Sequence, residues 1–103
     1  MDESKIRVAG NTHYPCLIAL VQKGYDVVIC STVNSSHEEF EAEKDGNTFS
    51  ATNPQELLGL VAMWEVRGQR WREFSDDDRR IQQEIEDGAR IYDDDGNDIS
   101  STD

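Results

Sequence analysis

Four side chains that could ligate a soft metal or act in nucleophilic catalysis are His13, Cys16, Cys30 and His37. Their spacing is H-x2-C-x13-C-x6-H, whereas zinc sites bring four ligands together and pair them closely at both ends of the motif. Both cysteines lie in apolar runs, where a free thiol behaves as a small hydrophobic side chain. We therefore expect no metal and no cofactor. A small enzyme built on His13 or His37 remains one alternative.

Some acidic residues also have a spacing that suggests chemistry. Asp93, Asp95 and Asn97 alternate as in the first half of a calcium-binding loop, but glycine stands at loop position 4 instead of position 6. A carboxylate that acts as a general acid or base usually lies in an apolar setting. Only Asp26 and Glu65 border apolar runs, and we expect both to face solvent, as most carboxylates do. The sequence has no nucleophile elbow, P-loop or dinucleotide glycine pattern, so we expect no enzymatic activity.

Half of the ten basic residues are arginines that fall within fourteen positions, beside two tryptophans. They are Arg67, Arg70, Arg72, Arg79 and Arg80, near Trp64 and Trp71. A cluster of basic and aromatic side chains can bind single-stranded nucleic acid. Acidic residues interleave this cluster, and the formal net charge of −12 repels phosphates. We therefore expect ion pairs within the chain and no nucleic-acid partner.

The negative charge is concentrated in the last third of the 103 residues. Residues 1–72 contain ten acidic and seven basic residues, a net charge of −3, whereas residues 73–103 contain twelve acidic and three basic residues, a net charge of −9. No apolar run approaches the roughly 18 residues that a membrane span needs, and the polar first residues do not resemble a signal peptide. With two cysteines in apolar runs, we expect a reducing, cytoplasmic compartment and no membrane.

The first half of the chain predicts strands around one helix. We expect a short edge strand at Ile6–Ala9 and a helix near residues 13–23 that ends at a glycine. The run from Tyr25 to Cys30 is apolar on both faces, which fits a central strand, or a strand covered on one side and wet only at its ends. Alternation over residues 38–43 predicts a half-buried strand.

A hairpin and a well-capped helix follow. The Asp45-Gly46 pair predicts a tight turn into a strand over residues 48–51, in a register that places Phe49 near Phe40 or Ala42. Asn53 and Pro54 then predict the start of a helix that runs to about Arg67. Its expected core stripe is Leu57, Leu58, Leu60, Val61 and Trp64. The opposite face holds Gly59, Ala62, Met63 and Val66, which is so apolar that we expect something to pack on it.

The last third predicts an acidic helix with little apolar surface. Ser75 precedes three aspartates that suit the positive end of a helix, which we expect to end near Asp87. Its apolar residues are Ile81 and Ile85, with Phe74 upstream. A short strand is expected at Ala89–Tyr92, and then a turn and a frayed end.

These elements predict an α+β fold, in which a small, mostly antiparallel sheet of three to five strands packs on two helices and an acidic C-terminal helix lies outside. The expected order is β-α-β-β-β-α-α. We expect a single domain over residues 1–92 and an acidic tail over residues 93–103.

The leading functional hypothesis is a non-enzymatic acidic module that binds a basic protein, because charge at an interface steers and selects partners. Bacterial immunity proteins that neutralise basic nuclease toxins are the model for such an inhibitor. The residues expected to bind the partner are Trp71, Asp77, Asp78, Glu84 and Asp87. A second hypothesis is a homo-oligomeric structural or adaptor protein, for example a homodimer, that self-associates through Gly59, Ala62, Met63 and Val66.

Overall fold

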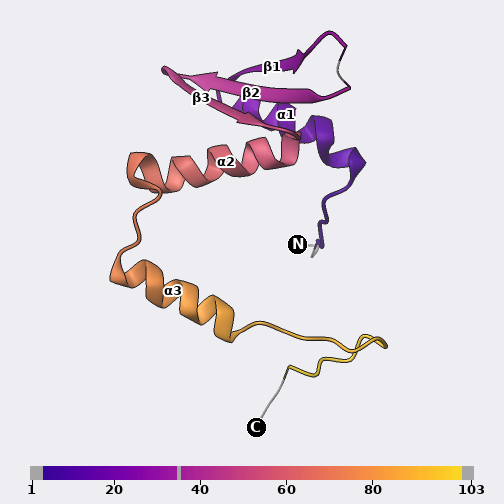
Figure 1. Cartoon of the computed structure of the whole chain (residues 1–103), viewed down its shortest axis with the longest axis vertical. Coiled ribbons are helices and arrows are strands. Elements are labelled where there is room, and N and C mark those ends of the chain that lie inside the picture. The colour runs from indigo at the N-terminus through magenta and orange to yellow at the C-terminus, as the bar shows by residue number, and fades with distance from the viewer. Residues whose placement is uncertain (1–3, 35, 101–103) are drawn as a thin grey trace. The chain divides into compact units, whose positions relative to one another are not determined.

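The computed structural model describes residues 4–34 and 36–100. The chain forms two compact units, residues 1–69 and residues 70–103, and each is described by itself. Within the described residues, the first unit contains an antiparallel sheet of three strands and two α-helices, and the second contains one α-helix (Figure 1). The predicted α+β class with a small antiparallel sheet is confirmed. The predicted extents of a domain over residues 1–92 and a tail over 93–103 stay a prediction.

The sheet has the order β1-β2-β3, with β1 spanning Asp26–Ser31, β2 spanning Glu38–Lys44 and β3 spanning Asn47–Ala51. Asp45 and Gly46 form the hairpin turn with φ angles of 53° and 85°, the left-handed backbone that such a turn needs. Phe49 lies opposite Ala42 in the β2–β3 register, so the predicted hairpin and its register are confirmed.

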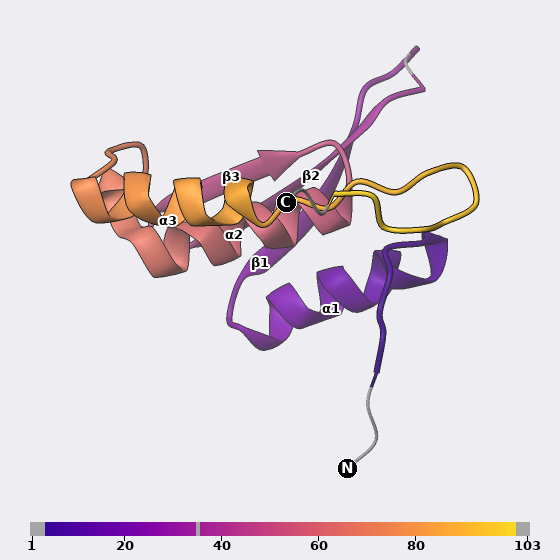
Figure 2. The ribbon, with the colours of Figure 1, turned by 90° about the horizontal axis from the view of Figure 1, so that it is seen from below.

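Both helices of the first unit pack on the same face of the sheet (Figures 1 and 2). The short helix η1 (Gly10–Thr12) leads into α1 (His13–Gln22), which packs against β1 and α2. Helix α2 (Pro54–Arg67) packs against β2 and β3 and continues into η2 (Gly68–Arg70). The Asn53 side chain accepts a hydrogen bond of 2.7 Å from the Glu56 backbone N–H, which confirms the predicted N-cap.

The core of the first unit lies between the helices and the covered face of the sheet. Its buried residues are Leu17, Leu20, Tyr25, Phe40, Ala42, Phe49, Leu57 and Val61. The predicted stripe of α2 supplies two of them, and Leu58, Leu60 and Trp64 are partly buried against them. The Trp64 ring contacts the edge of Phe49, with 5.4 Å between ring centroids.

In the second unit, α3 spans Asp76–Asp87, as predicted. The Ser75 side chain accepts from the Asp78 backbone N–H at 3.0 Å, and the Asp78 carboxylate accepts from the Ser75 N–H at 2.9 Å, which makes a complete capping box. From Ala89 to Ser100 the chain has irregular structure, with an antiparallel bridge between Tyr92 and Asp98.

Three sequence-based predictions about strands are wrong. Ile6–Ala9 has irregular backbone instead of forming an edge strand, because it leads directly into η1 and pairs with no described strand. The Tyr25–Cys30 run is not a central strand: β1 is an edge strand, and Val28 and Ile29 in its middle are 54% and 44% exposed. The strand expected at Ala89–Tyr92 is reduced to the single Tyr92 bridge. Within the described residues, no helix has the length and apolar character needed to cross a membrane.

Candidate functional site

Local interactions support helix α3. None of its twelve residues, all within the described part of the chain, is buried. A helix this short is marginal in water unless caps and side-chain pairs support it. The capping box at Ser75 and Asp78 supplies one support, and ion pairs and hydrogen bonds between residues three or four apart supply the rest.

One face of α3 carries an exposed apolar stripe. Ile81 and Ile85 are 46% and 70% exposed, and at 100° per residue they lie on the same side of the helix. By the same geometry, Asp78 lies on one side of this stripe, and Asp77 and Glu84 lie on the other. Three of the four carboxylates predicted to bind a partner therefore border the apolar stripe, whereas Asp87 lies farther round the helix.

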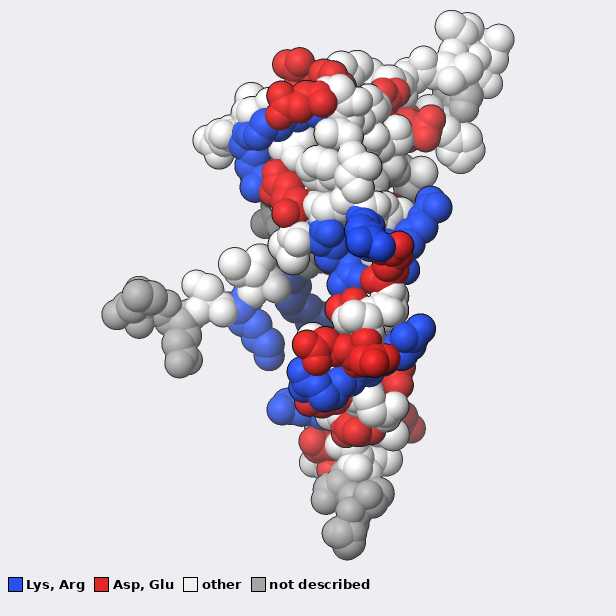
Figure 3. All heavy atoms as spheres, turned by 90° about the vertical axis from the view of Figure 1, so that its left-hand side faces the viewer, with Lys and Arg blue, Asp and Glu red and all other residues white. Residues whose placement is uncertain are grey.

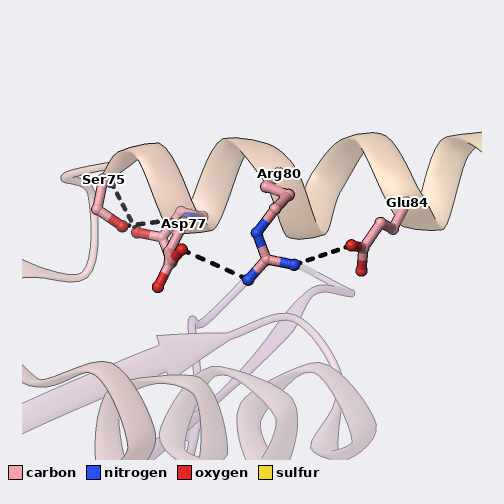
Figure 4. A network of polar contacts seen from close by, with 5 residues as sticks. Ser75, Asp77, Arg80 and Glu84 are labelled. Atoms are coloured by element: carbon pink, nitrogen blue, oxygen red, sulfur yellow. Dashed lines mark hydrogen bonds and ion pairs between the residues drawn. The ribbon is translucent and has the colours of Figure 1, made fainter.

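Two of those carboxylates share one arginine (Figure 4). Arg80 donates to Glu84 at 2.8 Å and to Asp77 at 3.4 Å, and all three side chains are at least 60% exposed. Exposed pairs of this kind each contribute only about 0.3–0.5 kcal/mol. They hold the side chains in register along the helix, and Figure 3 shows acidic and basic side chains interleaved along α3.

The C-terminal end of α3 is acidic, which opposes the helix dipole. Glu84, Glu86 and Asp87 occupy the last turn, where no basic residue lies, although cations are the residues that stabilise this end of a helix. Gln82 donates to Glu86 at 3.0 Å and Gln83 donates to Asp87 at 2.8 Å, so these carboxylates are held without being neutralised. These residues therefore support the helix through side-chain pairs, while their charges oppose its dipole.

The other predicted partner residues have additional structural roles. The Asp78 carboxylate forms part of the capping box, so replacing it would weaken the helix itself. Trp71 is half-buried, and the Arg72 guanidinium lies over its ring at 4.7 Å from the centroid, a cation–π contact.

The predicted self-association residues lie on an uncovered face of α2. Gly59, Ala62 and Val66 are exposed, Val66 by 86%, and Met63 is half-buried. A Cβ placed on Gly59 would meet nothing within 4 Å. Gly59 and Ala62 line a shallow hollow together with Ile6 and Val8. The three exposed residues are therefore not covered as the sequence led us to expect.

The two histidines line one hollow of about 490 Å³ at the end of the sheet, together with Cys30. His13 lies edge-on to Phe40, with 6.0 Å between ring centroids, and its Nδ1 is 3.5 Å from Gln55 Nε2. The Cys30 thiol donates to Glu41 at 3.2 Å, and this hydrogen bond, with some desolvation and the nearby negative charge, raises the pKa of the thiol. Cys16 lies elsewhere, and among the described residues no group of three or more His, Cys, Asp or Glu side chains could hold a metal ion. A raised pKa also makes the thiol a poorer nucleophile at neutral pH.

Asp93, the first residue of the pattern that resembles a calcium loop, accepts hydrogen bonds from the backbone of its own turn. One Asp93 carboxylate oxygen accepts from the backbone N–H groups of Asn97 at 2.8 Å and Asp95 at 3.0 Å. These hydrogen bonds, with that from the backbone of Asn97 foremost, lower the pKa of Asp93. The arrangement closes the turn below the Tyr92–Asp98 bridge.

A polar network that the sequence did not predict joins the connection between α1 and β1 to α2. The hydroxyl of Tyr25, a residue only 4% exposed, donates to Glu65 at 2.8 Å, and Lys23 pairs with the other oxygen of Glu65 at 2.8 Å. Hydrogen bonds from Lys23 and then Tyr25 lower the pKa of Glu65, whereas burial and the Glu65 hydrogen bond raise the pKa of Tyr25 to about 12. Tyr25 and Glu65 are 40 residues apart, and no sequence pattern links them.

The open face of the sheet is a second acidic surface. Glu39, Glu41 and Glu43 alternate along the central strand β2 on the side opposite the buried Phe40 and Ala42. Alternate residues of a β-strand lie about 7 Å apart, so neighbouring glutamates on this face are separated by about that distance. This is the half-buried strand that the alternation in the sequence predicted.

Comparisons of the chain with protein-family models, curated proteins and solved structures find no match.

Proposed function

We propose that the chain is a non-enzymatic module that binds a basic protein through α3. The observation that carries this proposal is a capped acidic helix whose apolar stripe, Ile81 and Ile85, is not buried. An amphipathic helix of this kind binds by laying its apolar face into a groove of a partner. An inhibitor of a basic enzyme, on the model of immunity proteins, is the most specific form of this proposal.

The charges favour a groove with a basic rim. The second unit, residues 70–103, contains twelve acidic and five basic residues, a net charge of −7. Cations from a partner would pair with Glu84 and Asp87. They would also compensate the negative charge at the C-terminal end of the helix dipole. Binding would thus relieve an unfavourable feature of the free helix.

A matched pair of charge variants tests the proposal. Glu84→Gln/Asp87→Asn changes α3, and Glu39→Gln/Glu43→Gln changes the open sheet face; each pair raises the formal charge from −12 to −10. The tagged parent and variants serve as baits in extracts of the source cell at low and high salt, with Ile81→Ser/Ile85→Ser as a third bait. We expect the parent to retain a basic protein that high salt releases.

The α3 charge variant and the isoleucine variant should each lose that protein, and the sheet variant should keep it. Neutralising the two acids weakens the Arg80–Glu84 pair, worth about 0.3–0.5 kcal/mol, but also removes charges that oppose the dipole. The two effects offset each other, so the helical signal in circular dichroism should change little. Equal retention by all baits would show that α3 is not the binding surface. Loss by both charge variants but not by the isoleucine variant would show a response to total charge alone.

A second candidate function is self-association. The observation that favours it is the amount of apolar surface that the first unit leaves exposed, including the α2 face with Val66.

A further inference from the structure

We infer that a second copy of the chain binds the flank of the first unit formed by the outer edge of β1 and the exposed side of α1, which would join two three-stranded sheets into one. This surface, the β1–α1 flank, consists of β1 (Asp26–Ser31) and the α1 residues Tyr14, Ile18 and Val21. It extends the self-association candidate and differs from the α2 face that the sequence suggested.

The strand half of the flank is an unprotected edge. In the described sheet, β1 pairs with β2 on one side only. Its pairing with β2 is continuous from Asp26 to Ser31 without a bulge, and the strand contains no lysine or proline. Bulges, edge lysines and prolines are the devices by which monomeric proteins prevent edge-to-edge pairing. An edge without them has backbone groups that another antiparallel strand can satisfy.

The helix half lies beside that edge. Helix α1 packs against β1 and α2. At its two ends, Lys23 forms an ion pair with Glu65 of α2, and Gln55 of α2 donates a 2.9 Å hydrogen bond to Thr12. At 100° per residue, Tyr14, Ile18 and Val21 lie on the side of α1 turned away from α2. They are 65%, 52% and 57% exposed. The apolar stripe of α1 and the free edge of β1 therefore belong to the same flank.

The low charge of the β1–α1 flank favours a second copy of the chain as its binding partner. Helix α1 has no Asp, Glu, Lys or Arg, and β1 has only Asp26, in a chain with a net charge of −12. A basic partner gains most from the acidic surfaces, whereas two identical acidic chains repel each other wherever those surfaces meet. A nearly neutral flank fits another neutral flank. A two-fold axis can place β1 of one copy antiparallel to β1 of the second copy, so the same residues form both halves of the interface.

Surface variants test this inference without disturbing the core. Ile18→Glu and Val21→Glu each place a carboxylate on the flank, and Val66→Glu places one on the α2 face as the matched control. Sedimentation velocity is measured over a hundredfold range of protein concentration, with circular dichroism to verify folding. We expect the parent and Val66→Glu to shift reversibly from monomer to dimer with concentration, and both flank variants to stay monomeric.

Hydrogen exchange tests the strand half separately. In the parent, the amides of β1 should become more protected as the concentration rises, and in Ile18→Glu they should not. A parent that is monomeric at every concentration would overturn the inference. So would a folded Ile18→Glu that dimerises like the parent, or a Val66→Glu that alone fails to dimerise. None of these outcomes bears on the α3 proposal, because the flank and α3 belong to different units.

Discussion

Replacing Tyr25 by Phe should remove one hydrogen bond and little else. The ring is 4% exposed and lies edge-on to Phe49 at 6.1 Å, a contact that Phe retains. The lost bond joins the hydroxyl to the charged Glu65 at 2.8 Å, and hydrogen bonds to charged groups contribute about 1.5–3 kcal/mol. The Glu65 side chain is 30% exposed and keeps Lys23, so water compensates in part. We therefore expect a loss of about 1.5 kcal/mol at neutral pH.

The pH dependence of that loss is the sharper test. Folding raises the pKa of Tyr25 from 10.0 to about 12, so the folded chain holds the phenol proton more tightly than the unfolded chain. The corresponding stability is fully present below the unfolded pKa and is lost as the pH rises through the folded one. At about pH 11, deprotonation of Tyr25 should lower the free energy of unfolding of the parent by roughly 1.4 kcal/mol. Tyr25→Phe has no phenol at this position, so the free energies of unfolding of the two proteins should converge.

Urea denaturation followed by circular dichroism at the two pH values measures both effects. Tyr14→Phe is the matched control, because Tyr14 is 65% exposed. This substitution should change the free energy of unfolding by less than about 0.5 kcal/mol. A Tyr25→Phe difference below about 0.5 kcal/mol at neutral pH, or one that does not shrink at alkaline pH, would refute the role given to the network.

Further predictions concern packing, exposure and charge. Trp64→Ala should cost about 2–3 kcal/mol in urea denaturation, less than a fully buried tryptophan, because Trp64 is half-buried against Phe49; a loss under about 1 kcal/mol would contradict this packing. Ala62→Arg should change stability by less than about 0.5 kcal/mol because Ala62 is exposed, and a larger loss in thermal denaturation would show that the residue is covered. Deleting residues 93–103 takes the formal charge from −12 to −7 by removing five acidic residues; the melting temperature of the first unit should stay within a few degrees, since its core lies in residues 17–61.

The sequence predicted those elements whose signals are local. Asn53 before Pro54, the Asp45-Gly46 turn and Ser75 before three aspartates each satisfy backbone groups within a few residues, so their effect does not depend on the rest of the fold. These positions define α2, the β2–β3 hairpin and α3.

Features that depend on distant contacts were not predicted. An apolar strand has the same composition at an edge as at the centre, and only the order of the sheet shows that the flank of β1 is open. The Tyr25–Glu65 bond connects residues 40 positions apart. For α3, periodicity identified the isoleucines, but only the structure shows that Asp78 is engaged in a cap, while Asp77 and Glu84 border the stripe.

We propose that α3 binds a basic protein through its apolar stripe and through the acidic residues beside the stripe and at the C-terminal end of the helix. Stopped-flow association of the captured basic protein with the parent, Ile81→Ser/Ile85→Ser and Glu84→Gln/Asp87→Asn, at two ionic strengths, tests it most directly. We expect association of the parent to slow as salt rises, the charge variant to associate more slowly with a weaker salt dependence, and the isoleucine variant to dissociate faster. Rate constants that are the same for all three proteins would contradict the claim.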